Sequence, residues 1–309
     1  MRCVIGCAAL GGLYAPVTEA QAHQTLQTAW DLGFRDFDTA PHYGVGQSEE
    51  YLGSFLAGRP RDSFTVSTKV GRLLVDDPDA VDGTDEFYGT PKRSRVRDYS
   101  AEGVRRSLEQ SLARLGLDRV DVLYVHDPED HLEQAVSEAA PALARLRAEG
   151  VITGYGVGTN YVDVALAFLR ETDADRFMIA GRYSLLDRRA ERTLLPACAD
   201  KGVRLVVAGV LNSGLLADPR PGAPFNYVPA PDWLVAAARR MQAVCETRGV
   251  PLRAAALQFP TRHPAVAAVV SGAGTAEQVR DVHTQFTAEV PEELWAELDT
   301  LVPDQDRLP

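Results

Sequence analysis

Short runs of apolar and β-branched residues alternate along the chain with longer segments in which apolar residues recur every three or four positions. The first pattern is typical of buried strands and the second of helices that bury one face, so the alternation predicts repeated strand–helix units and a parallel sheet. The candidate strands are Cys3–Ala8, Arg35–Asp38, Phe64–Lys69, Val120–His126, Thr153–Val157, Phe177–Ala180, Arg204–Ala208 and Val266–Val270.

Helix signals lie between these strands. A helix over Thr18–Leu32 begins with a Thr cap, one over Tyr99–Leu115 has Ser100 at its start, and one over Ser137–Ala148 ends before Gly150. No Ser- or Pro-rich linker separates two halves of the chain. Eight strand–helix units without a linker favour a closed (β/α)8 TIM barrel, and we expect residues 1–309 to form a single domain of this kind.

Two long stretches interrupt this rhythm and are expected to be irregular, Gly71–Asp98 and Asn212–Pro231. Each follows a predicted strand. In a barrel the loops after the strands build the catalytic face, so both are expected near a functional site. The pattern assigns no specific role to Gly71–Asp98.

Composition narrows the class of partner. A formal net charge of −11 argues against nonspecific binding to nucleic acid or to an anionic membrane, because phosphate groups would repel the chain. The longest apolar runs, such as Leu205–Leu211, are far shorter than the ~20 residues that span a bilayer. The four cysteines lack paired metal-ligand spacing. We expect a cytoplasmic monomer or homodimer that binds a small molecule.

Polar residues capable of acid–base chemistry lie at or just after the ends of neighbouring strands: Asp38, Tyr43, Lys69 and His126. Each alone has an ordinary structural explanation, but barrel closure would bring them together. A tyrosine has a reference pKa near ~10, and the ammonium of Lys69 would favour its phenolate. Asp38 would hold Lys69 protonated, and His126 would orient a substrate oxygen.

Three segments resemble aldo-keto reductases, and the resemblance extends along nearly the whole chain: Gly33–Gly44, Ser67–Val70 and Ser111–Pro128. The resemblance implies hydride transfer with a nicotinamide cofactor, either NAD or NADP. It also implies a catalytic tetrad made of Asp38, Tyr43, Lys69 and His126.

Further segments resemble the family's cofactor site. Gly156–Asn160 is similar to the segment whose Asn holds the nicotinamide carboxamide, and the glycine-rich turn after the last strand occupies the place of pyrophosphate binding, where backbone N–H groups can hold an anion. The cofactor residues implied are Asn160, Tyr183, Ser271, Gly272, Gly274, Thr275 and Gln278.

Basic residues bear on the choice between the two nucleotides. The 2′-phosphate of NADP would require a dedicated Arg or Lys. The stretch 271–278 contains none and Arg280 is the nearest, which favours NAD unless Arg262 reaches the phosphate from another loop.

Two departures from the family are visible beside the expected nicotinamide. Small residues occupy the stretch Val207–Gly214, where many members have an aromatic side chain, and Ala180 stands in place of the usual Gln. Nicotinamide packing is therefore expected to differ in detail.

A finer resemblance concerns the substrate. Asp98–Ser100, Ile179–Asp187, Val210–Ala217 and Ala256–Pro260 look like the aldose 1-dehydrogenase branch, which includes enzymes acting on L-fucose, D-threo-aldoses and L-galactose. It implies oxidation of the anomeric hydroxyl of an aldose such as L-fucose, D-arabinose or L-galactose to a lactone. Action on another aldehyde or ketone, including pyridoxal, stays open.

Two alternatives of other classes stay open. The cluster His126–His131 has the residue types of a metal site, as a sugar isomerase or epimerase would need, but in the resemblance His126 faces the cofactor, so no metal is expected. A non-catalytic, nucleotide-binding redox sensor is the other alternative, and the complete tetrad argues against it.

Overall fold

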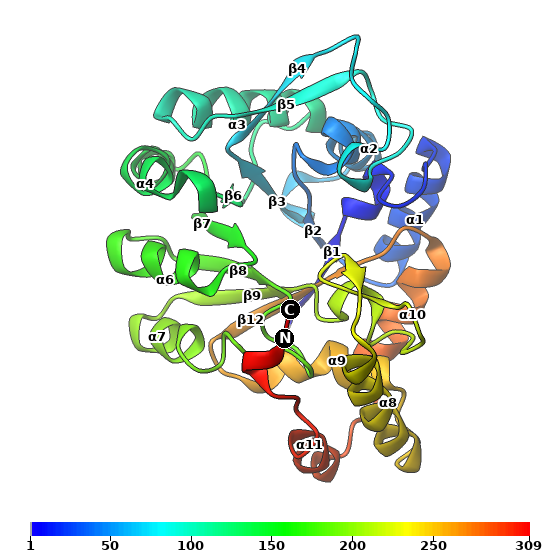
Figure 1. The fold of residues 1–309 in the computed structure, drawn as a ribbon. Coiled ribbons are helices and arrows are strands. Elements are labelled where there is room, and N and C mark those ends of the chain that lie inside the picture. The colour runs from blue at the N-terminus through cyan, green and yellow to red at the C-terminus, as the bar shows by residue number, and fades with distance from the viewer. Residues whose placement is uncertain (1) are drawn as a thin grey trace.

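The computed structural model describes residues 2–309, and eight parallel strands close into a barrel in the order β1-β12-β9-β8-β7-β6-β3-β2 (Figure 1). All eight predicted strands are present, which confirms the (β/α)8 barrel. Their bounds are β1 Arg2–Gly6, β2 Asp36–Asp38, β3 Thr65–Val70, β6 Val122–His126, β7 Gly154–Thr159, β8 Arg176–Ala180, β9 Arg204–Ala208 and β12 Val266–Gly272.

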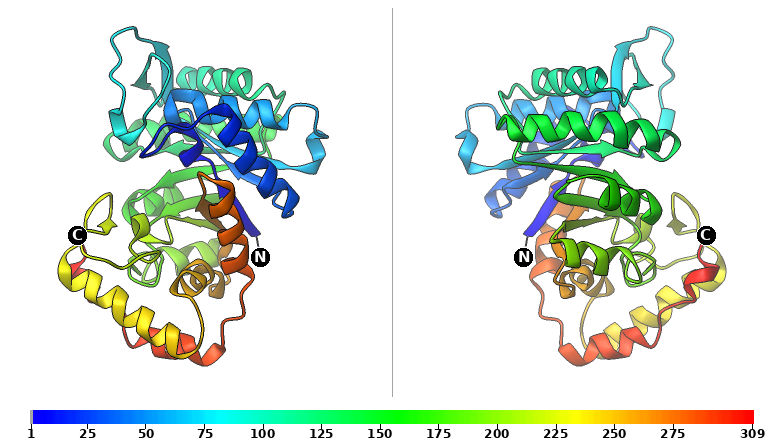
Figure 2. Two further views of the ribbon diagram at one scale, coloured as in Figure 1. Left: turned by 90° about the vertical axis from the view of Figure 1, so that its right-hand side faces the viewer. Right: turned by 90° about the vertical axis from the view of Figure 1, so that its left-hand side faces the viewer.

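Helices surround the barrel (Figure 2). The caps predicted at Thr18 and Ser100 are both formed, at the starts of α1 and α3, and Thr18 also forms a capping box with Gln21. The third predicted helix begins earlier than expected, because α4 continues through a π-helical turn over Ala135–Ala139 into α5. The bounds are α1 Glu19–Asp31, α2 Gln47–Leu56, α3 Ala101–Leu115, α4 Leu132–Gln134, α5 Ala140–Ala148, α6 Val162–Glu171, α7 Leu194–Lys201, α8 Asp232–Thr247, α9 Leu252–Gln258, α10 Ala276–Thr287 and α11 Glu292–Asp299.

The stretch Gly71–Asp98 is not irregular throughout, as the sequence suggested, but contains an antiparallel hairpin that projects from the barrel at the top of Figure 1. Its strands are β4 Arg72–Asp76 and β5 Arg93–Arg97. Leu73 and Leu74 are buried, and β4 packs against α3. The charged residues of β5 conceal the alternation of apolar and polar residues by which strands are usually recognised.

The stretch Asn212–Pro231 is mostly irregular, as expected. It contains a short 3₁₀ turn and a two-residue ladder between β10 Pro224–Phe225 and β11 Val228–Pro229. The end of the chain returns to this region, where the carbonyl oxygen of Pro309 accepts a hydrogen bond of 2.9 Å from Asn226.

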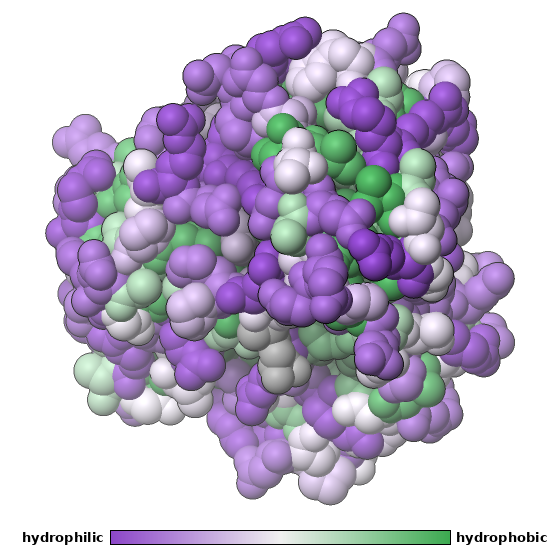
Figure 3. Space-filling model, turned by 90° about the horizontal axis from the view of Figure 1, so that it is seen from below, coloured by the Kyte–Doolittle hydropathy of each residue, from purple (hydrophilic) through white to green (hydrophobic). Residues whose placement is uncertain are grey.

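Hydrophilic residues dominate the face shown in Figure 3, where hydrophobic residues form small separated groups. Within residues 2–309, none of the helices combines the length and the hydropathy that a membrane span requires.

Candidate active site

Strand register brings three of the four candidate residues to the same end of the barrel. β2, β3 and β6 are neighbours, and Asp38 pairs with Ser67 while Lys69 pairs with Tyr124. Asp38 and His126 are the last residues of their strands, and Lys69 is the last but one of its own. The carboxyl ends of parallel strands therefore place these side chains around one opening, as the sequence analysis predicted.

A buried ion pair lies at the centre of this opening. The Lys69 Nζ donates to Asp38 Oδ2 at 2.7 Å and to the carbonyl oxygen of Thr39 at 2.9 Å, and Lys69 is only 2% exposed. Burial acts to lower the pKa of Lys69, but Asp38 and Tyr43 outweigh it, so the pKa lies above its usual value. The lysine is therefore a fixed positive charge at neutral pH.

Tyr43 follows β2 at the start of a 3₁₀ turn over Tyr43–Gly46. Lys69 Nζ lies 4.7 Å from the centre of its ring. The backbone approaches that of Gly11 so closely that a Cβ on Gly44, whose φ is +60°, would lie 2.2 Å from the Gly11 carbonyl oxygen. Glycine at position 44 is what allows the turn to present Tyr43 to the opening.

The pKa of Tyr43 is raised to about 12, mainly because burial disfavours the phenolate; Lys69 acts to lower this pKa and Asp38 acts to raise it. Lys69 was expected to favour the phenolate and so to lower the pKa of Tyr43. The direction of the lysine's effect is confirmed, but the expected net decrease is wrong for the protein alone, because removal of the phenol from water outweighs one neighbouring cation.

His126 faces Tyr43 across the opening, with ring centres 5.9 Å apart and ring planes nearly perpendicular. Its Nδ1 is buried and has no hydrogen-bond partner among residues 2–309. Burial lowers the pKa of His126 well below its usual value, and Arg72, Lys69 and His42 lower it further. The imidazole is therefore neutral and can hydrogen-bond an oxygen without adding a second charge.

Tyr99 supports this histidine and was not singled out by the sequence analysis. It is fully buried, and its hydroxyl donates to the carbonyl oxygens of His126 at 2.7 Å and of Asp127 at 2.9 Å. Gly71, with φ of +103°, lies so close to the Tyr99 ring that a Cβ at this position would be 2.2 Å from it. The resemblance of Asp98–Ser100 to the aldose 1-dehydrogenase branch was the signal in the sequence that included Tyr99.

The candidate cofactor residues lie at the same end of the barrel. Asn160 follows β7 and is half-buried, and its carbonyl oxygen accepts from Arg182 at 2.8 Å. Ser271 and Gly272 end β12, and Thr275 caps α10. Gln278 folds back so that its side-chain oxygen accepts from the Gly274 N–H at 2.7 Å.

Beside Gly272 the space is open, because an added Cβ would meet its nearest atom at 4.0 Å. An open glycine turn ahead of a helix, with the unpartnered His126 Nδ1 near the opening, fits a nicotinamide nucleotide. Tyr183 fits less well. It is 3% exposed and packs against Phe259 with ring centres 5.0 Å apart, so its place in the cofactor site stays a prediction that the packing does not favour.

Residues 2–303 match the model of the aldo/keto reductase family. The chain belongs to this family. Enzymes of the family use NAD(P)(H), and the chain is accordingly an NAD(P)-dependent oxidoreductase.

Several relatives of this aldo/keto reductase are similar along nearly their whole length. It is 43% identical over 300 residues to a D-threo-aldose 1-dehydrogenase from a Pseudomonas species, covering 95% of this chain and 91% of that protein. It is 40% identical to a pyridoxal 4-dehydrogenase from Microbacterium luteolum, covering 95% of this chain and 92% of that protein. It is 32% identical to an L-galactose dehydrogenase from Arabidopsis thaliana, covering 98% of this chain and 86% of that protein.

Solved structures agree with the fold. An aldo-keto reductase from Bacillus halodurans has a TM-score of 0.78 at 26% identity, covering 99% of this chain and 95% of that one. A glycerol dehydrogenase from Gluconobacter oxydans has a TM-score of 0.77 at 25% identity, covering 97% of this chain and 90% of that one.

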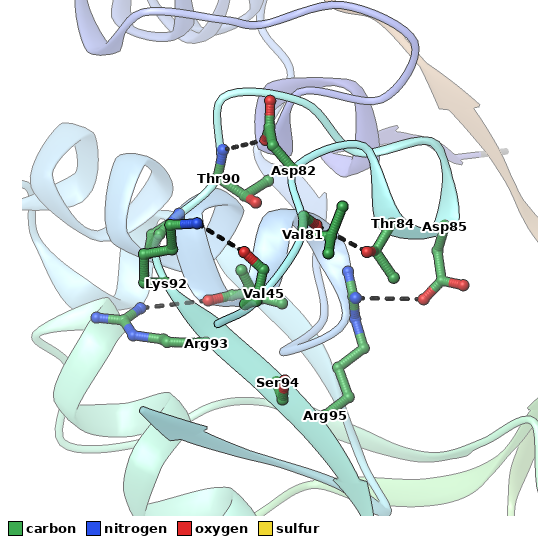
Figure 4. A pocket seen from close by; sticks show the side chains of 12 residues that line it. Val45, Val81, Asp82, Thr84, Asp85, Thr90, Lys92, Arg93, Ser94 and Arg95 are labelled. Atoms are coloured by element: carbon green, nitrogen blue, oxygen red, sulfur yellow. Dashed lines mark hydrogen bonds and ion pairs between the residues drawn. The ribbon is translucent and has the colours of Figure 1, made fainter. Parts of the chain in front are cut away.

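A separate hollow of about 260 Å³ lies beneath the hairpin of this aldo/keto reductase (Figure 4). Two of its arginines are in ion pairs, Arg93 with Glu50 at 2.7 Å and Arg95 with Asp85 at 3.2 Å. Its lining residues do not include the four tetrad candidates. The hollow is therefore a feature of the hairpin and not the candidate active site.

The cluster His126–His131 does not have the arrangement of a metal site. Among residues 2–309 no group of three His, Cys, Asp or Glu side chains is placed to hold a metal ion. The Asp127 carboxylate is instead paired with Arg72 at 2.8 Å.

Proposed function

We propose that this aldo/keto reductase oxidises the anomeric hydroxyl of an aldose, such as L-fucose, D-arabinose or L-galactose, to the lactone. The main support for the chemical part is that the buried Lys69 ammonium lies 4.7 Å from the centre of the Tyr43 ring and that the centre of the neutral His126 ring lies 5.9 Å from it. The substrate class is supported by similarity to the D-threo-aldose 1-dehydrogenase and the L-galactose dehydrogenase.

In this proposal Tyr43 as phenolate accepts the proton of the C1 hydroxyl, and the C1–H bond breaks with its electron pair as the C1=O bond forms. Lys69 stabilises the phenolate, and Asp38 holds Lys69 in place. His126 hydrogen-bonds the C1 oxygen and keeps it near Tyr43. NAD(P)⁺, when bound, supplies the hydride acceptor and a second positive charge.

For the nucleotide, we propose that Asn160 holds the carboxamide and that Ser271, Gly272, Gly274, Thr275 and Gln278 surround the pyrophosphate and adenosine. NAD is the favoured form, because 271–278 contains no basic side chain. The four cysteines are free, which supports a reducing, cytoplasmic environment.

The test is a screen of the purified protein against L-fucose, L-galactose, D-arabinose, pyridoxal and simple aldehydes, following absorbance of the reduced nicotinamide with each nucleotide. The proposal expects oxidation of at least one aldose, faster with NAD⁺. Turnover of pyridoxal alone would favour the second candidate, which rests on the relative that is 40% identical. Tight nucleotide binding without turnover of any substrate would favour the redox-sensor alternative.

A further inference from the structure

Arg72, the first residue of the hairpin, bridges two polar side chains beside the candidate active site. Its Nη2 donates to Asp127 Oδ2 at 2.8 Å, and its Nη1 lies 3.2 Å from His42 Nδ1. The Arg72 side chain is only 12% exposed. One buried guanidinium thus holds a residue that precedes Tyr43 and a residue that follows His126.

The bridge determines which nitrogen of His42 carries its proton. A guanidinium has donors and no acceptor, so His42 Nδ1 must accept and the proton lies on Nε2. Burial and the cations Arg72, Arg95 and Lys69 lower the pKa of His42 to about 2, so the ring remains neutral. Its centre lies 5.6 Å from that of His126 and 6.1 Å from that of Tyr43. His42 therefore carries one N–H donor, on a ring that lies beside the rings of His126 and Tyr43.

Asp127 supplies an acceptor in the same place. Its Oδ2 lies 3.5 Å from His126 Nε2, and its side chain remains 24% exposed. The backbone φ of +43° turns this residue sharply after the strand. A carboxylate can accept about four hydrogen bonds, so the contact with Arg72 leaves capacity for a ligand.

We propose that Asp127 and His42, held by Arg72, recognise the substrate hydroxyl next to the reacting carbon. A hydroxyl donates one hydrogen bond and accepts others, so an adjacent carboxylate oxygen and imidazole N–H suit it and do not suit a hydrogen atom or a methyl group. Asp127 and His42 are specificity-determining residues, and Arg72 is a positioning residue. The inference rests on the proposed function and narrows its substrates to compounds hydroxylated at C2.

The same arrangement disfavours substrates without this hydroxyl. When such a substrate displaces water, the partly exposed Asp127 carboxylate and the His42 N–H lose hydrogen-bond partners that the substrate does not replace. Because a hydrogen bond to a charged group is lost, we expect kcat/KM to be about 10- to 100-fold higher for the hydroxylated compound than for the compound without the hydroxyl.

The experiment compares kcat/KM for D-arabinose with kcat/KM for 2-deoxy-D-ribose, the corresponding pentose without the C2 hydroxyl. Taking the ratio in each variant cancels the difference in intrinsic reactivity between the two sugars. We expect Asp127→Ala to reduce the ratio at least about tenfold, because the loss falls mainly on D-arabinose.

The matched control is Arg97→Gln. Arg97 lies directly across the hairpin from Arg72, but its partner is the exposed Asp130 at 2.7 Å. This variant should keep the wild-type ratio. If Asp127→Ala does not fold, Arg72→Lys serves instead, since an ammonium retains the charge but cannot present the planar fork that spans both partners. An equal loss of activity on both sugars would show a merely structural role and overturn the inference.

Equilibrium binding distinguishes this inference from the proposed function. In the Tyr43→Phe protein with NAD⁺, D-arabinose should bind at least about tenfold more tightly than 2-deoxy-D-ribose, and Asp127→Ala should remove the difference. Equal dissociation constants would overturn the inference even if the wild-type enzyme oxidises aldoses. If binding depends on the C2 hydroxyl but the wild-type enzyme oxidises no aldose, the result counts against the proposed function and not against this inference.

Discussion

Replacing Lys69 by Met removes a buried positive charge that lies 4.7 Å from the centre of the Tyr43 ring. Two unit charges at such a distance interact by roughly 3.5 kcal/mol at an effective dielectric constant of about 20, which corresponds to about 2.5 pH units. Removing the cation raises the pKa of Tyr43. Because oxidation requires the phenolate, the pH at half-maximal kcat/KM should rise by about 2 units.

The assay measures initial rates of aldose oxidation against pH, with circular dichroism and nucleotide affinity recorded in parallel, because Asp38 loses its partner in this variant. Lys201→Met is the matched control, since Lys201 Nζ binds the carbonyl oxygen of Leu169 at 2.7 Å, away from the tetrad. The control should keep the wild-type profile. A Lys69→Met enzyme with a lower rate but an unshifted profile would refute the role assigned to Lys69.

The remaining predictions concern Tyr43, Asn160 and a buried ion pair. Tyr43→Phe should lower kcat by about 10²- to 10⁴-fold with little change in nucleotide affinity, and wild-type turnover would exclude Tyr43 as the proton carrier. Asn160→Ala should raise the KM for the nucleotide by roughly tenfold, and an unchanged KM would contradict its place in the cofactor site. Arg114→Met removes the cation that binds the fully buried Glu49 carboxylate at 2.7 Å and leaves it, among the described residues, only the hydroxyl of Thr68, so the free energy of unfolding measured in urea should fall by about 3–5 kcal/mol. The exposed Arg105→Met is its control, and equal losses would argue against a special role for the pair.

The strands could be predicted because the barrel buries them, so that they form apolar runs in the sequence. The hairpin could not, because charged side chains hold it: Arg93 pairs with Glu50, and Arg95 donates to the carbonyl oxygen of His42. Those partners lie 43 and 53 residues away in the sequence. A local pattern contains no information about such distant pairings.

The same limit applies to the candidate site. Asp38, Lys69 and His126 could be identified from the sequence because they lie at the ends of predicted strands, and closure of the barrel brings those ends together. The role of Arg72 was missed because its partners His42 and Asp127 lie 30 and 55 residues away. The pKa of Tyr43 was misjudged for a related reason, since burial depends on the tertiary structure and the neighbouring charge was the only influence visible in the sequence.

The hairpin of β4 and β5 forms a two-stranded sheet of its own, separate from the barrel ladder. The proposed proton-handling groups therefore belong to the barrel, while Arg72 belongs to an insertion that pairs with none of its strands. If Arg72 positions Asp127 and His42 as proposed, substitutions in this hairpin would change which substrates are accepted and leave the proton-handling groups of the barrel in place. Exchanging the hairpin between members of the family would therefore alter substrate range and redox chemistry separately.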